Sequence, residues 1–199
     1  KGEKDQGWVL HRLVYDKHQE LATYFVTRCD VRDDHAVYGS STLIMASERG
    51  YLEIVQALLG REGTDVNKGD YRGNTALHLA ASTGHIEVAR ALLQAGANAR
   101  KSNEEGRTPL HYASREGHIE IVRALLEAGA GADVRKCDTA FYNHSPISHA
   151  CEGKHFEVFR ALVEAGGDVN KLDSRGYTAL HDASYHGLTE EVRYLCVER

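Results

Sequence analysis

The sequence predicts an all-α solenoid of about six stacked helix-turn-helix units, with β-turns or short hairpins at the tips between units. The main observation is that the stretch from Thr75 to Ala97 recurs almost unchanged from Thr108, a shift of 33 residues. In each copy, apolar residues have helical spacing and glycines stand where a helix must end. Self-similarity at such a period is typical of stacked repeats, in which each unit completes the core of its neighbours.

Each copy contains two short predicted helices. Leu77, Ala80 and Ala81 are small apolar residues at helical spacing and indicate the first helix. Gly84 then indicates a sharp reversal of the chain, because glycine tolerates a positive φ. An apolar face indicates the second helix, and its members are Ile86, Ala89, Leu92 and Leu93. Gly96 follows and is expected to end this helix.

The 33-residue period and the segment Thr108-Pro109-Leu110-His111 together resemble the ankyrin-repeat family. The resemblance implies a groove formed by the tips and the first helices, and a role in binding another protein or peptide. It also implies that the histidine of this segment links the threonine hydroxyl to neighbouring backbone.

We predict that residues 1–199 form one domain whose first and last repeats are atypical. The predicted repeats are 1–34, 35–69, 70–102, 103–139, 140–172 and an incomplete 173–199. The fifth repeat departs most from the period, because Thr108 and its counterpart Ser145 are 37 residues apart. The four extra residues fall around 130–143, and insertions in repeats usually lie in loops on one face, often the binding face.

Composition excludes several classes of function. The net charge is −5 and the isoelectric point is about 6.2, whereas a nucleic-acid-binding protein usually has a basic surface. No apolar run approaches the ~20 residues that a membrane helix needs. Cys29, Cys137, Cys151 and Cys196 have no paired spacing, so we expect reduced thiols and a cytoplasmic location, with the nucleus as the alternative. We expect a monomer.

No common catalytic motif is present, so we expect neither an enzyme nor a cofactor. Eight of the twelve histidines occupy recurring repeat positions, which favours a structural role for them. The best metal candidate is the group Cys137, His144, His149, Cys151 and His155. Their spacing does not match a zinc motif, so we expect no metal site.

By alignment with the repeat, we expect a partner to contact the tips and the exposed positions of the first helices. The predicted contact residues are Tyr38, Tyr71, Arg72, Glu104, Glu105, Arg115, Phe141, Tyr142, Arg175, Tyr185 and His186. Tyrosine and arginine are enriched at interface hot spots. The alternative is a regulatory sensor domain of an enzyme or channel that binds a small anion or nucleotide, but the arginines alternate with glutamates, which disfavours it.

Two asparagines are candidate sites of modification. Asn67 and Asn170 each end an Asp-Val-Asn sequence, with a leucine eight residues upstream. The pattern resembles the site that an asparaginyl hydroxylase uses in other ankyrin-repeat proteins. The alternative is an ordinary turn asparagine, which such turns favour for local hydrogen bonding.

Overall fold

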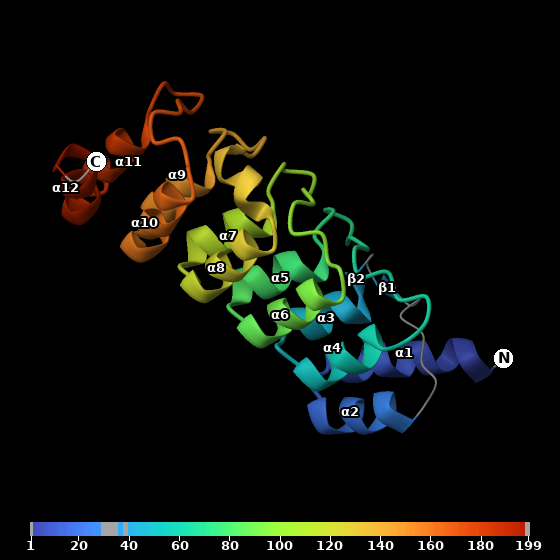
Figure 1. The fold of residues 1–199 in the computed structure, drawn as a ribbon. Helices are drawn as coiled ribbons and strands as arrows, with labels where there is room; N and C mark the ends of the chain where they lie inside the picture. Colours follow the sequence, from blue (N-terminus) through green and yellow to red (C-terminus); the bar gives the residue numbers. More distant parts are fainter. Residues whose placement is uncertain (1, 29–35, 38–39, 198–199) are drawn as a thin grey trace. The chain divides into compact units, whose positions relative to one another are not determined.

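The computed structural model describes residues 2–28, 36–37 and 40–197. Their contacts divide the chain into two compact units, residues 1–98 and 99–199. Each unit is built from antiparallel pairs of helices, as Figure 1 shows. The all-α solenoid predicted from the repeat is confirmed.

The first unit contains three helix pairs. Its elements are α1 (Gly2–Tyr15), α2 (Gln19–Arg28), β1 (Ala36–Val37), β2 (Ser40–Ser41), α3 (Thr42–Glu48), α4 (Leu52–Leu59), α5 (Ala76–Thr83) and α6 (Ile86–Gln94). First helices pack on first helices, α1 on α3 and α3 on α5, and second helices pack on second helices, α2 on α4 and α4 on α6. Strands β1 and β2 form an antiparallel hairpin at one tip, with Ala36 paired to Ser41.

The second unit repeats this plan with one addition. Its elements are α7 (Pro109–Glu116), α8 (Ile119–Glu127), the 3-10 helix η1 (Ala130–Arg135), α9 (Pro146–Gly153), α10 (Phe156–Glu164), α11 (Ala179–Tyr185) and α12 (Thr189–Val197). Helix α9 packs between α7 and α11, and α10 packs between α8 and α12. The helix η1 contacts α7, α8 and α9 in the connection that precedes the fifth repeat.

Threonine and histidine start several of the first helices. In α7, Nδ1 of His111 accepts hydrogen bonds from the backbone N–H of Thr108, at 3.1 Å, and from its hydroxyl, at 2.9 Å. Nε2 of the same ring donates to the carbonyl of Lys136, at 3.0 Å. The histidine therefore links its own helix start to the next connection, as the family resemblance implied. Burial lowers the pKa of His111 to about 3, which keeps the ring neutral.

The core lies between the helix pairs of each unit. In the third repeat, Leu77, Ala80 and Ala81 are buried as predicted. The second helix differs, because its fully buried residues are Val88, Ala89 and Leu92. Ile86 and Leu93 are only half-buried, so the inner face of α6 is rotated relative to the predicted one.

The first repeat also differs from the alignment. Helix α1 starts at Gly2 and runs through Trp8, which aligns with the helix-capping Thr75. No cap is needed at Trp8 because the helix continues past it. Nδ1 of His11 instead lies 3.4 Å from the hydroxyl of Thr42, in the second repeat.

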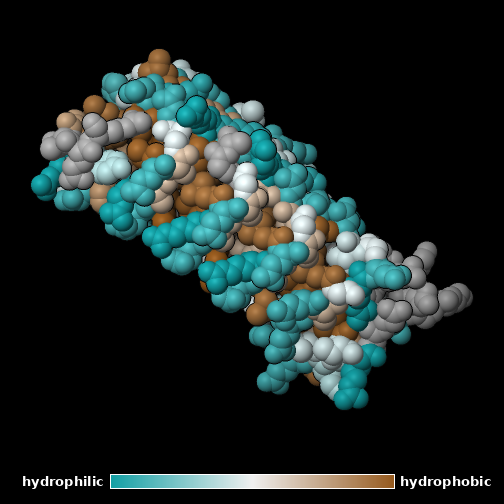
Figure 2. Space-filling model, viewed as in Figure 1, coloured by the Kyte–Doolittle hydropathy of each residue, from teal (hydrophilic) through white to brown (hydrophobic). Residues whose placement is uncertain are grey.

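On the face that Figure 2 shows, rows of hydrophilic residues alternate with bands of hydrophobic residues. No helix among the described residues is long and apolar enough to cross a membrane.

Candidate functional site

The tips of the third to sixth repeats are each organised by one acidic or amide side chain. In the third repeat, Oδ1 of Asp70 accepts hydrogen bonds from the backbone N–H groups of Arg72 and Asn74, at 2.8 and 2.9 Å. Asn103 and Asp173 accept the equivalent pair of bonds in the fourth and sixth repeats. Such side-chain turns fix the tip backbone and leave the other tip side chains free to face solvent.

The tip of the fifth repeat is longer than these. The backbone N–H of Asn103 donates to the carbonyl of Arg107, four residues on, whereas that of Asp138 donates to His144, six residues on, at 2.9 Å. The four extra residues predicted for this repeat are therefore shared equally between the tip and the connection that contains η1. The structural start of the fifth repeat is Asp138, two residues before the predicted boundary at 140.

Both neighbouring tips hold this longer tip in place. The backbone N–H of Thr139 donates to the carbonyl of Glu105, at 2.7 Å. On the other side, Ser174 donates from its backbone N–H to Tyr142, at 3.0 Å, and from its hydroxyl to the carbonyl of Phe141, at 3.1 Å. These hydrogen bonds fix the backbone of the loop, so its side chains extend from a rigid backbone.

The two aromatic side chains of this tip differ in their surroundings. Phe141 is 89% exposed, and Tyr142 is 42% exposed. The Tyr142 ring stacks on His144, with centroids 5.4 Å apart, and the guanidinium of Arg175 lies 4.4 Å from its centroid. Tyr142 is thus partly folded against the repeat, whereas Phe141 projects into solvent.

A hollow of about 280 Å³ lies beside this tip in the second unit. It is lined by Arg107, Arg115, Asp138, Ala140, Phe141, Tyr142, His144, His149 and Glu152. Of the predicted contact residues, Arg115, Phe141 and Tyr142 line it directly. Glu105 is near it, because its carboxylate pairs with Arg107 at 2.8 Å.

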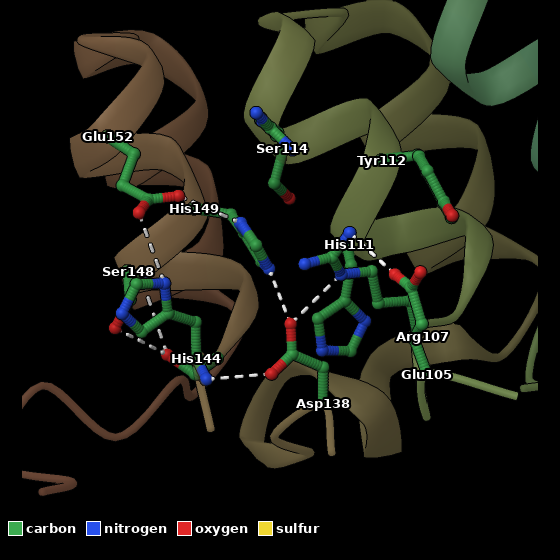
Figure 3. A network of polar contacts seen from close by, with 12 residues as sticks. Glu105, Arg107, His111, Tyr112, Ser114, Asp138, His144, Ser148, His149 and Glu152 are labelled. Carbon is green, nitrogen blue, oxygen red and sulfur yellow. Dashed lines mark hydrogen bonds and ion pairs between the residues drawn. The ribbon is translucent and has the colours of Figure 1, made fainter. Parts of the chain in front are cut away.

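Figure 3 shows the polar network at the base of the hollow. Asp138 is its centre: one carboxylate oxygen, Oδ2, accepts from Nε of Arg107 and Nε2 of His149, each at 3.0 Å. The other oxygen accepts from the backbone N–H of His144, at 2.9 Å. Burial would raise the pKa of Asp138, but the hydrogen bonds from His149 and Arg107 outweigh burial and lower it.

Glu152 adds a second carboxylate above the two histidine rings. Its oxygens lie 3.3 Å from Nδ1 of His144 and 3.3 Å from Nδ1 of His149. The neighbouring histidines lower the pKa of Glu152. Burial would lower the pKa of His149, but the carboxylates of Asp138 and Glu152 outweigh burial and raise it.

Arg107 in the wall of the hollow and the neighbouring Arg175 are already neutralised by carboxylates, whereas the exposed Arg115 lies 4.0 Å from the carboxylate of Glu116. Arg107 contacts Glu105 and Asp138, as described above. Arg175 contacts Asp173 at 2.7 Å and Asp182 at 3.3 Å. The surface therefore offers an exposed aromatic ring surrounded by paired charges, and it does not offer a concentrated positive charge for an anion.

The remaining predicted contact residues are spread over the chain. Tyr71 and Arg72 lie at a tip of the first unit, where the guanidinium is 5.3 Å from the exposed tyrosine ring. Tyr185 is exposed at the end of α11, and its ring meets His186 edge to face. Glu104 is exposed at the tip of the fourth repeat. Tyr38 lies outside the described residues.

The candidate metal group from the sequence is only partly brought together. Among the described residues, the one group that places three possible ligand atoms within 4.8 Å of one another is His144, His149 and Glu152. Cys151 instead points at the carbonyl of Ala179, at 4.0 Å, and the His155 ring packs beside Gly117 and Gly153. No sequence motif singles out Asp138 or Arg107, although His149 and Glu152 have the i, i+3 spacing of one helix face.

The two candidate asparagines occupy similar turns. The backbone N–H of each donates to the aspartate two residues before it, at 2.9 Å for Asn67 and 3.0 Å for Asn170. The side-chain oxygen of Asn67 also accepts from the backbone N–H of Asn98, at 2.7 Å. Asn170 is exposed and Asn67 is half-buried. Hydroxylation stays a prediction.

A comparison with protein families agrees with this architecture. A family model described as ankyrin repeats (three copies) matches residues 43–138 and 130–199, which is more than half of the chain. This chain belongs to the ankyrin-repeat family. Ankyrin repeats generally act as protein-protein interaction modules, and the family is typically non-enzymatic.

Several curated proteins are similar to part of this ankyrin-repeat chain. Inversin of Danio rerio is 31% identical over 78 residues, which is 39% of this chain and 8% of Inversin. Ankyrin repeat domain-containing protein 49 of Bos taurus is 42% identical over 59 residues, which is 30% of this chain and 25% of that protein. Protein phosphatase 1 regulatory subunit 12A of Mus musculus is 38% identical over 81 residues, which is 41% of this chain and 7% of that protein. The aligned part is thus a quarter or less of each relative.

Proposed function

We propose that this protein binds a segment of another protein at the tip of its fifth repeat, with Phe141 as the main anchor. The observation that carries the proposal is the 89% exposure of this phenylalanine on a backbone that both neighbouring tips hold. A large apolar side chain kept in water contributes little to folding, whereas its burial on binding is favourable. Because the loop is already fixed, its ordering costs little when a partner docks.

The surroundings of Phe141 favour a protein segment that has both apolar and charged side chains. The hollow beside it is lined by the aromatic Tyr142 and by charges of both signs, including Arg115 and the carboxylates of the polar network. Interface hot spots typically combine an aromatic anchor with an arginine and a polar rim. A small anion or nucleotide is disfavoured, because Arg107 and Arg175 are neutralised by neighbouring carboxylates.

The test compares Phe141→Ala with Tyr24→Ala, against a partner first isolated by pull-down and identified by mass spectrometry. Tyr24 is a matched control, because it is 63% exposed on α2, in the other unit. We expect Phe141→Ala to weaken binding about thirtyfold, which corresponds to ~2 kcal/mol. Its melting temperature should stay near that of the parent, because the removed ring is exposed. Tyr24→Ala should leave affinity unchanged.

Two results would contradict the proposal. If Phe141→Ala binds the partner as the parent does, the fifth-repeat tip is not the anchor. If Phe141→Ala and Tyr24→Ala weaken binding equally, the partner recognises exposed aromatic rings without selecting this tip.

A further inference from the structure

Three side chains that commonly bind metals meet in the second unit. His144 ends the long tip of the fifth repeat, and His149 and Glu152 lie one turn apart on the same face of α9. One oxygen of Glu152 is 3.3 Å from Nδ1 of His144, and the other is 3.3 Å from Nδ1 of His149. Figure 3 shows the Glu152 carboxylate facing both imidazole rings.

The buried ring of His149 has one nitrogen without a hydrogen bond. This side chain is 2% exposed, and its Nε2 donates to Oδ2 of Asp138, at 3.0 Å. Nδ1 points toward Glu152 but makes no hydrogen bond of acceptable geometry. Because Nε2 donates to Asp138, a neutral ring would turn the lone pair of Nδ1 toward a carboxylate, and a proton or a cation on Nδ1 makes that arrangement favourable.

We propose that Nδ1 of His144, Nδ1 of His149 and the carboxylate of Glu152 bind a Zn²⁺ ion. Zinc prefers four tetrahedral ligands of this kind, with bonds of about 2.0–2.2 Å, so two ligand atoms should be about 3.3 Å apart. Each Glu152 oxygen is at that separation from one ring, Oε1 from Nδ1 of His144 and Oε2 from Nδ1 of His149. One ligand atom from each of the three residues lies within 4.8 Å of the others. A tetrahedral site then needs both rings to approach one shared carboxylate oxygen, and a fourth ligand, which water can supply.

The residues around the three ligands suit this role. Asp138 holds Nε2 of His149, which is the carboxylate–histidine pairing that orients a zinc ligand. It also accepts from the backbone N–H of His144, so one carboxylate positions both histidines. Nε2 of His144 lies 3.3 Å from the guanidinium of Arg175 and 3.8 Å from the carboxylate of Asp173. Because arginine only donates, Nε2 accepts from Arg175 in the metal-free protein and the ring hydrogen is on Nδ1. Zinc on Nδ1 moves that hydrogen to Nε2, which must then leave Arg175 and bond to Asp173.

The site differs from the one considered in the sequence, where the irregular spacing led us to expect no metal. The cysteines of that group do not belong to it, because Cys151 is buried against α11 and Cys137 is absent from the wall of the hollow. The proposed ligands are therefore two histidine nitrogens and a carboxylate oxygen. The two extra residues in the tip of the fifth repeat bring His144 next to α9. This inference is independent of partner binding through Phe141.

The test is a zinc titration of the Cys196→Ser protein by calorimetry, with Co²⁺ absorption as a second probe. Replacing Cys196 removes an exposed thiol that would bind either ion. We expect one ion per chain, and a Co²⁺ spectrum typical of tetrahedral nitrogen and oxygen ligands without thiolate bands. His144→Gln, His149→Gln and Glu152→Gln should each weaken Zn²⁺ binding at least tenfold. His186→Gln, at a histidine outside the network, is the control and should bind as the parent does.

Asp138→Asn separates a positioning role from a purely structural one. It should weaken Zn²⁺ binding about 10- to 100-fold. The melting temperature of every variant is measured without metal, and Glu152→Gln changes an exposed side chain, so at least one ligand variant is expected to fold normally. The proposal is overturned if no one-to-one binding is found, or if a folded His144→Gln protein binds Zn²⁺ as tightly as the parent. Either result would mean that a proton occupies the position beside Glu152.

Discussion

At the scale of single residues, the threonine–histidine pairs are expected to contribute unequally to the free energy of unfolding, because some are buried and others are exposed. Thr108 and His111 are both buried, and Nε2 of His111 also bonds to the next connection. In the sixth repeat, the same pair, Thr178 and His181, makes the same two bonds, but the histidine is exposed. Water can replace a lost hydrogen bond only at the exposed pair.

This difference predicts unequal costs for the same substitution. Thr108→Val removes a capping hydroxyl in a buried setting and should lower the free energy of unfolding by about 2 kcal/mol. Thr178→Val removes the equivalent hydroxyl at the exposed pair and should cost about 0.5 kcal/mol. Urea unfolding of the two variants beside the parent gives both values. Equal losses would show that burial of the pair does not matter.

At the scale of elements, glycine ends the first helices α5 and α7 and lets neighbouring repeats approach. Gly117 ends α7 with φ of +78°, and a Cβ atom there would lie 2.5 Å from the His155 ring. Gly129 has φ of +93° after α8, but a Cβ atom there would meet nothing within 4 Å. Both positions have the left-handed backbone conformation, but only at Gly117 is there no room for a side chain.

We therefore expect Gly117→Ala to be more damaging than Gly129→Ala. Gly129→Ala should cost about 1–2 kcal/mol from backbone strain alone. Gly117→Ala should add ~1–3 kcal/mol, because His155 must move. Thermal or urea unfolding of both variants tests this, and similar midpoints would show that the His155 ring moves aside freely.

The helices were predictable from the sequence, but the polar network was not. The recurring threonine and the histidine three residues after it predict helix starts at Thr75, Thr108 and Thr178, since each unit repeats the same local chemistry. The contact between Asp138 and His149 depends on how the four inserted residues of the fifth repeat are distributed, two in its tip and two in the connection that contains η1. The repeat period predicts how many residues are inserted but not where they lie. Helix α1 was misjudged for a related reason, because alignment with later repeats hides a helix that starts earlier.

At the scale of the whole molecule, this ankyrin-repeat chain uses repeated helix pairs as a scaffold and varies its tips. The tips of the third, fourth and sixth repeats are five residues long from the organising aspartate or asparagine to its backbone partner, and the tip of the fifth repeat has seven. The longer tip carries the exposed Phe141 and brings His144 to α9. Function is therefore expected at the place where the repeat is broken, whereas the regular repeats supply rigidity.

The most direct test of the central claim, that the partner binds at the fifth-repeat tip, is hydrogen–deuterium exchange with and without the isolated partner. We predict slower exchange in residues 138–144 and in α7 when the partner is bound, because both border the hollow. Helix α2, in the other unit, serves as the internal reference and should exchange at the same rate in both samples. Protection confined to other segments, with unchanged exchange in 138–144, would contradict the account.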